Sequence, residues 1–177
     1  MVVAYRLGAM HTRFRALLPP MFGALLKRYP QAPLKEVGTF APKGSDRSMG
    51  HALISDGTIK FNLYWFAQDP AVLAAAARTR PDMPLGNDTS LAFHGAMVDE
   101  PLHVVTHEFG HCLAVAHKGA EALSRQWWRE ACLNPGLAPA AYALVNPIEY
   151  WAELFAAFEL QAHIGPHIDE MRVFLGK

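Results

Sequence analysis

The sequence predicts an α+β fold in which a small mixed sheet packs on helices. Two observations lead to this prediction. Segments that alternate like β-strands flank an Asp56-Gly57 turn in the first part of the chain. The later part instead contains long apolar stretches with helix start signals. No linker or repeat divides the 177 residues, so we expect one domain (1–177) with a sheet-bearing part (1–100) and a helical part (101–177).

The N-terminal elements follow from periodicity and turn signals. Apolar residues recur at near-helical spacing over residues 12–29, but Pro19-Pro20 is expected to split or restart that helix. An Ala-rich helix is expected over residues 69–80, then a loop over 85–89 and a short strand over 90–95. Three earlier segments are predicted as strands: residues 34–40, 49–55 and 58–64.

The C-terminal part is predicted to be helical. Its first helix follows Asp99-Glu100-Pro101, because acidic residues and proline suit the first turn of a helix. This helix is apolar on most sides, so we expect it to be buried. The predicted C-terminal helices cover residues 102–117, 121–132, 146–159 and 168–175.

One pentapeptide carries the strongest functional signal. His107-Glu108-Phe109-Gly110-His111 has the spacing H-E-x-x-H within the first of these helices. Histidines at positions i and i+4 point to one side of a helix, so two imidazoles can bind one Zn²⁺. Glu108 would lie beside the ion and could take a proton from bound water. The pentapeptide predicts a zinc site with His107 and His111 as ligands and Glu108 as general base.

Two neighbouring histidines are candidates for a third ligand. His103 continues the series on the same face, but it lies about 12 Å of helical rise from His111, which favours a packed or wall histidine. His117 has the spacing of the third metzincin histidine, but Ala114 replaces the glycine at which that helix breaks. If the helix continues through Ala114, His117 points about 120° away from His111.

A second helix supplies two further candidates. Residues 146–159 begin with Asn and Pro, and Glu149 and Glu153 are spaced i, i+4 among aromatic residues. Two buried carboxylates need compensation, which a metal ion or a metal-bound histidine would provide. One glutamate would bind Zn²⁺, and the other would accept the free ring N–H of a zinc-bound histidine. The alternative is an amphipathic helix whose acids face water.

The two motifs together resemble a known family. HEFGH, followed by Tyr142, Asn146 and the run EYWAELFA from Glu149, is similar to gluzincin metallopeptidases related to the catalytic domain of anthrax lethal factor. Pro-Pro endopeptidases belong to the same group, whose signature is Y-x6-E-[FY]-[FW]-A-E-x-F. The resemblance covers residues 102–177 and does not extend to residues 1–100.

The resemblance implies a zincin-like fold and a zinc-dependent endopeptidase that acts on a protein or peptide substrate. It implies Glu149 as the third zinc ligand, Glu153 as the carboxylate that supports the ligands, and Tyr142 as the phenol that stabilises the oxyanion. A fourth position on Zn²⁺ would stay open for the water that Glu108 deprotonates. The strand expected at residues 90–95 would be the sheet edge that pairs with the substrate, and the alternative is an ordinary edge strand without that role.

Two other functions stay open. One is a non-catalytic module of a phage or toxin polypeptide, in which zinc only stabilises the fold. The other is a metzincin-like enzyme that uses His117. The presence of Glu108 and Tyr142 disfavours the first alternative, because a purely structural zinc site needs neither residue.

Composition sets further limits. Sixteen acidic residues balance 16 Lys and Arg, so no basic field indicates nucleic acid or a membrane surface, and nothing indicates an oligomeric state. No apolar run reaches transmembrane length, and no signal peptide is evident. We therefore expect a cytoplasmic protein or export by another route. Cys112 and Cys132 do not form a disulfide framework, and Cys112 is expected to be a small buried hydrophobic residue.

Overall fold

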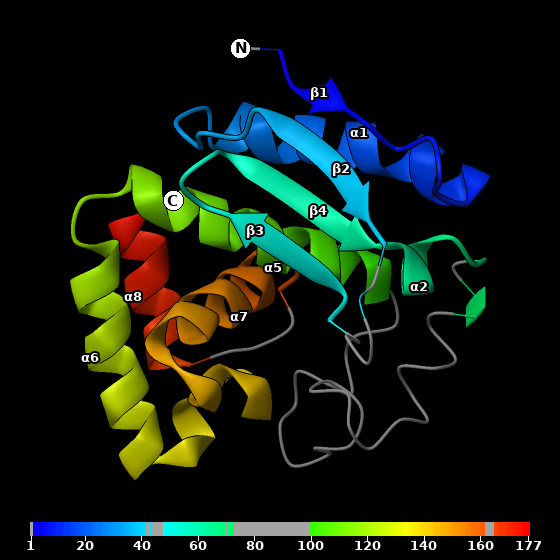
Figure 1. The fold of residues 1–177 in the computed structure, drawn as a ribbon. Helices are drawn as coiled ribbons and strands as arrows, with labels where there is room; N and C mark the ends of the chain where they lie inside the picture. The colour runs from blue at the N-terminus through cyan, green and yellow to red at the C-terminus, as the bar shows by residue number, and fades with distance from the viewer. Residues whose placement is uncertain (1, 42, 44–47, 70, 73–99, 162–164) are drawn as a thin grey trace.

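The computed structural model describes residues 2–41, 43, 48–69, 71–72, 100–161 and 165–177. Within them the chain forms a small sheet and a group of helices (Figure 1). The strands are β1 (Ala4–Tyr5), β2 (Glu36–Phe40), β3 (Gly50–Leu53) and β4 (Thr58–Asn62). The α-helices are α1 (Thr12–Arg28), α2 (Leu63–Phe66), α5 (Glu100–Ala116), α6 (Ala120–Leu133), α7 (Pro147–Glu159) and α8 (Pro166–Phe174). Two 3₁₀ turns, η1 (Pro135–Leu137) and η2 (Ala141–Val145), connect α6 to α7.

The four described strands form one mixed sheet in the order β1-β2-β4-β3. β1, β2 and β4 run parallel, and β3 pairs antiparallel with β4. The expected hairpin at Asp56-Gly57 joins β3 to β4, and Gly57 adopts the positive φ (67°) for which glycine is suited. β3 is therefore an outer strand among the described ones, and its direction is opposite to that of its neighbours.

An aromatic core joins the sheet to the long helices. The ring of Phe22 on α1 lies 6.3 Å from that of Phe61 on β4 and 6.4 Å from that of Phe109 on α5. All three side chains are fully buried. Hence α1 and α5 pack against the same face of the sheet, and burial of these rings, each contributing about 1.5–3 kcal/mol, holds α5 in place.

α5 and α7 pack closely because Gly110 has no side chain. A Cβ at Gly110 would lie 3.2 Å from the Cα of Ala152 and 3.1 Å from the ring of Phe155 on α7. The indole Nε1 of Trp151 donates to the carbonyl of Gly110 at 3.0 Å. The ring of Trp127 on α6 stacks on that of Trp151 at 6.2 Å. α7 is consequently enclosed between α5 and α6, which fixes the position of its first turn.

Most predicted elements are present, with two corrections. Pro19-Pro20 does not split the first helix, because α1 is continuous from Thr12 to Arg28. The two prolines cannot donate to the carbonyls of Arg15 and Ala16, but both of these residues are exposed, so water can bind there, while Phe22 on the other face stays buried. The strand predicted over 58–64 ends at Asn62, whose Oδ1 accepts from the Tyr64 amide at 2.9 Å and begins α2.

Some predictions fall outside the described residues. The loop expected at 85–89 and the strand at 90–95 lie there entirely, and so does most of the helix expected at 69–80. The coarse expectation of a small mixed sheet with helices is met, whereas a zincin-like fold stays a prediction. Among the described helices, none combines the length and the apolar character that crossing a membrane requires.

Candidate metal centre

α5 brings two imidazoles together. The Nε2 atoms of His107 and His111 are 3.0 Å apart, and both residues are buried at 7% exposure. The opposite side of α5 carries apolar residues such as Val105 and Phe109, which are fully buried. The helix is thereby held on one side by the core, and the two histidines project from the other side.

The first turn of α7 supplies a carboxylate. Oδ1 of Asn146 accepts from the backbone amides of Ile148 and Glu149, at 2.9 Å each, and Pro147 occupies the first helical position. This cap fixes the backbone from which Glu149 extends. Its Oε2 lies 3.1 Å from Nε2 of His107 and 3.5 Å from Nε2 of His111.

These three atoms fit a metal ion. Tetrahedral zinc with ordinary bond lengths places its ligand atoms about 3.3 Å apart, close to the three separations of 3.0, 3.1 and 3.5 Å. Oε2 of Glu149 is buried and accepts no well-aligned hydrogen bond from the described residues. His107, His111 and Glu149 could therefore hold one metal ion. Two imidazoles and a carboxylate are a donor set that suits zinc.

Glu153 lies behind this cluster and contacts two histidines. Its Oε1 is 2.8 Å from Nδ1 of His107 and 3.2 Å from Nε2 of His103. Glu153 and His103 are each 2% exposed. His103 is a packed residue, as expected, but the sequence interpretation missed its contact with Glu153. The spacing could have predicted this contact, because His103 precedes His107 by about one helical turn, just as Glu149 precedes Glu153.

His103, His107 and Glu153 also meet the geometric requirement for a metal ion. We favour direct contacts between these side chains over a second ion. Nδ1 of His107 and Oε1 of Glu153 lie 2.8 Å apart, as in a close ion pair, and Nε2 of His103 lies at hydrogen-bond distance, 3.2 Å, from the same oxygen. A histidine that donates from Nδ1 presents its Nε2 lone pair to the first cluster, which is the usual arrangement behind a metal ligand.

The charges in the cluster shift one another's pKa values. Burial lowers the pKa of His107, but the carboxylates of Glu153 and Glu149 outweigh burial and raise it to about 10. Burial raises the pKa of Glu149, but its contacts with His107 and His111 prevail and lower it to about 2. The pKa of Glu153 is likewise lowered, because His103 and His107 outweigh its burial. Both carboxylates are therefore ionised at neutral pH.

Glu108 lies beside the cluster, where β3 passes α5. Its side chain is 6% exposed, and burial raises its pKa. Gly50 on β3 makes room for it, since a Cβ there would lie 2.7 Å from Oε1 of Glu108. Sequence reasoning did not identify Gly50, because its proximity to Glu108 depends on how β3 packs on α5. A buried carboxylate with a raised pKa is suited to accept and return a proton.

Tyr142 approaches from η2. Its ring centroid lies 6.1 Å from that of His107. Burial, together with the charges of Glu149, Glu153 and Glu108, raises the pKa of its phenol to about 12. The hydroxyl is therefore protonated at neutral pH and can donate a hydrogen bond. The structure thus brings all six predicted site residues to one place: His107, Glu108, His111, Tyr142, Glu149 and Glu153.

His117 lies apart from both groups of potential ligands. α5 continues through Ala114 to Ala116, and Nε2 of His117, just beyond it, lies 2.7 Å from Nε2 of Gln31. This position disfavours the metzincin arrangement. Both cysteines are free; Cys112 is buried as expected, and burial raises the pKa of its thiol to about 12.

Comparisons with protein-family models, with curated proteins and with solved structures found no match for this chain.

Proposed function

We propose that this protein is a zinc-dependent endopeptidase of the gluzincin type, similar to the lethal factor and Pro-Pro endopeptidase group. The observation that carries the proposal is the convergence of His107, His111 and Glu149 with Glu108 beside them. A zinc ion bound by these three residues would activate a water molecule and polarise a peptide carbonyl.

The chain's own residues have distinct roles in this proposal. Glu108 takes a proton from the attacking water and passes it to the leaving amine. The Tyr142 hydroxyl donates a hydrogen bond to the oxyanion that develops on the carbonyl. Glu153 orients His107 so that Nε2 faces the metal position. Glu108 contributes nothing to holding the ion, which separates catalysis from metal binding experimentally.

Substitution of Glu108 tests the proposal. Glu108→Ala should retain stoichiometric zinc and the wild-type fold, but lose about 100-fold or more of the peptidase activity, because no other base replaces its carboxylate. Zinc content is measured by atomic absorption, and activity is measured by digestion of a peptide library with mass-spectrometric detection. Asp169→Asn, an exposed acid on α8, is the matched control and should behave as wild type.

Two results would overturn the proposal. Full activity in Glu108→Ala would exclude the general-base role. A wild-type protein that binds zinc stoichiometrically but cleaves no peptide in the library would instead favour the non-catalytic, zinc-stabilised module.

A further inference from the structure

The side chain of Glu108 is enclosed between α5 and the first residue of β3. Its carboxylate lies at the end of several rotatable bonds, so the backbone of α5 alone does not fix its position. The backbone of Gly50 lies directly against it, because a Cβ built there would be 2.7 Å from Oε1 and 3.0 Å from both Cδ and Cγ of Glu108. A side chain at position 50 and the observed position of the carboxylate therefore exclude each other.

The backbone conformation does not require glycine at position 50. Gly57 in the hairpin turn adopts a positive φ, whereas Gly50 does not, and it pairs as an ordinary strand residue with Phe61 of β4. Glycine inside a strand weakens it and often marks the close approach of another group. Since the close group here is the carboxylate of Glu108, the missing side chain benefits that carboxylate rather than the strand.

The start of β3 is anchored to the sheet by Asn62 of β4. The amide of Asn62 donates to the carbonyl of Met49 at 3.0 Å, and its side-chain Nδ2 donates to the carbonyl of Ser48 at 2.8 Å. Asn62 itself is fully buried. The backbone before Gly50 is thus fixed by two hydrogen bonds, so crowding at position 50 would displace the side chain of Glu108 rather than the strand.

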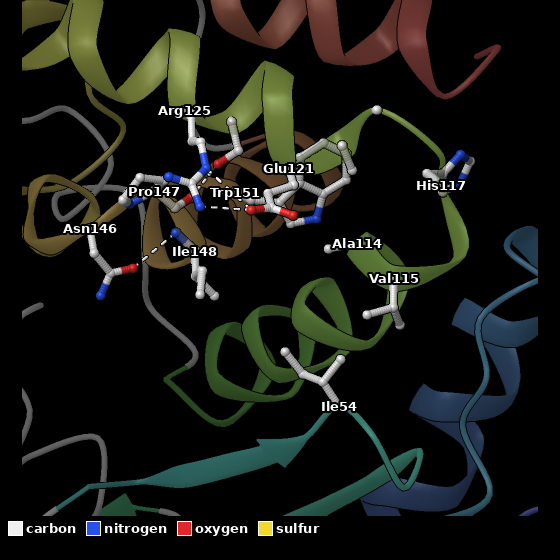
Figure 2. Close-up of a pocket in the computed structure, with 13 residues that line it drawn as sticks. Ile54, Ala114, Val115, His117, Glu121, Arg125, Asn146, Pro147, Ile148 and Trp151 are labelled. Carbon is white, nitrogen blue, oxygen red and sulfur yellow. Dashed lines mark hydrogen bonds and ion pairs between the residues drawn. The ribbon is translucent and has the colours of Figure 1, made fainter.

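β3 meets α5 at both of its ends. Directly after the strand, Ile54 lines the same groove as Val115 at the C-terminal end of α5 (Figure 2). The helix rises about 10 Å from Glu108 to Val115, and the strand advances about 13 Å from Gly50 to Ile54. Strand and helix therefore run side by side over this distance, which fixes the orientation of β3 against Glu108 as well as its position.

We propose that Gly50 is a positioning residue for the general base: the space that it leaves on β3 holds the Glu108 carboxylate where it can take a proton from water at the metal centre. This inference rests on the proposed function and adds to it a residue of the sheet, outside the two helices that carry the ligands. Displacement of a reacting group by about 1 Å can lower turnover about 100-fold. Metal binding should not change, because Glu108 is not among the three candidate ligands.

Substitution of Gly50 tests this role through turnover of a peptide that the wild type cleaves. Gly50→Ala should lower kcat by about 100-fold with KM changed by no more than about twofold, because a displaced base affects the transition state and not substrate binding. Its zinc content should equal that of wild type. Gly38→Ala on β2 is the matched control, since the nearest atom to a Cβ there would lie at 3.6 Å, an ordinary contact. Wild-type kcat in Gly50→Ala, or loss of its zinc, would overturn the positioning role.

A stability measurement separates this inference from the proposed function. By scanning calorimetry, Gly50→Ala should lower Tm by about 2–4 °C, because its methyl group and the Glu108 side chain compete for one space. In the Glu108→Ala protein the same substitution should leave Tm unchanged or raise it. This dependence on Glu108 supports the positioning even if the wild-type protein cleaves nothing, a result that would refute the peptidase proposal alone. An equal change of Tm in both proteins overturns the positioning and leaves the peptidase proposal standing.

Discussion

Glu153 connects two imidazoles through a single oxygen atom. Its Oε1 contacts both His103 and His107, and all three side chains are buried. If this buried carboxylate loses one of its two partners, its negative charge is less well stabilised, and its contact with the other histidine changes geometry. His103 therefore supports the candidate metal centre, although it is not one of the three residues of the first cluster.

Substitution of His103 should change metal affinity. His103→Leu removes the donor to Glu153 and should weaken zinc binding by about tenfold or more. His103→Gln keeps a donor and should retain most of the affinity. Competition titration with a chromophoric chelator measures both values. If His103 only fills space, His103→Leu will bind zinc as tightly as wild type.

At the scale of elements, the distance between α5 and α7 determines whether ligands from two helices can meet. Gly110 sets this distance, because a methyl group there would press on Ala152 and Phe155. The cost of glycine within a helix, about 1 kcal/mol relative to alanine, is thus offset by close packing. Gly23 on α1 provides a comparison, since nothing lies within 4 Å of a Cβ placed there.

The two glycines should respond differently to the same change. Gly23→Ala should raise the free energy of unfolding by about 0.5–1 kcal/mol, through helix propensity alone. Gly110→Ala should raise the free energy of unfolding by less, or lower it. It should also weaken zinc binding, because α7 and Glu149 must shift away from the histidines. Urea unfolding and zinc titration measure these effects. Equal gains in stability with unchanged zinc affinity would contradict the role assigned to Gly110.

Local patterns predicted some of these features and not others. The pairing of His107 with His111 follows from helical spacing alone, so the sequence was sufficient. Glu149 lies on a separate helix. Only the resemblance to a known family favoured it over Glu153 as the third zinc ligand. Gly50 depends on how β3 packs on α5, for which a single sequence carries no signal. Pro19-Pro20 misled the prediction, because burial of one face of α1 outweighs the lost backbone hydrogen bonds.

At the scale of the whole molecule, metal binding by this cluster would be coupled to folding and to pH. The cluster joins α5 to α7, so an ion that binds only the folded chain stabilises it, by about 4 kcal/mol at a thousandfold excess over the dissociation constant. The raised pKa of His107 means that its protonated form stabilises the metal-free fold. That contribution is complete below about pH 6.5 and disappears as the pH rises through about 10.

Removal of zinc should therefore lower Tm more at higher pH. His107 must lose its proton to bind zinc, so affinity should rise up to tenfold for each pH unit between pH 6 and 8. Chelation should lower Tm by about 10 °C near pH 7. This difference in Tm between the zinc-bound and zinc-free protein should widen by about 3–5 °C for each unit by which the pH rises. Scanning calorimetry with and without a chelator measures this gap. In Glu149→Ala the gap should nearly vanish; a gap independent of pH would refute the proton linkage.

The position of Glu149 in the first turn of α7 has a kinetic consequence. Terminal turns fray more readily than the middle of a helix, and this turn depends on the side chain of Asn146 for two of its amides. Both imidazoles, by contrast, come from the buried middle of α5. If an ion binds here, unwinding of this single turn would govern its residence time, and the ion could exchange with solvent without disturbing the core.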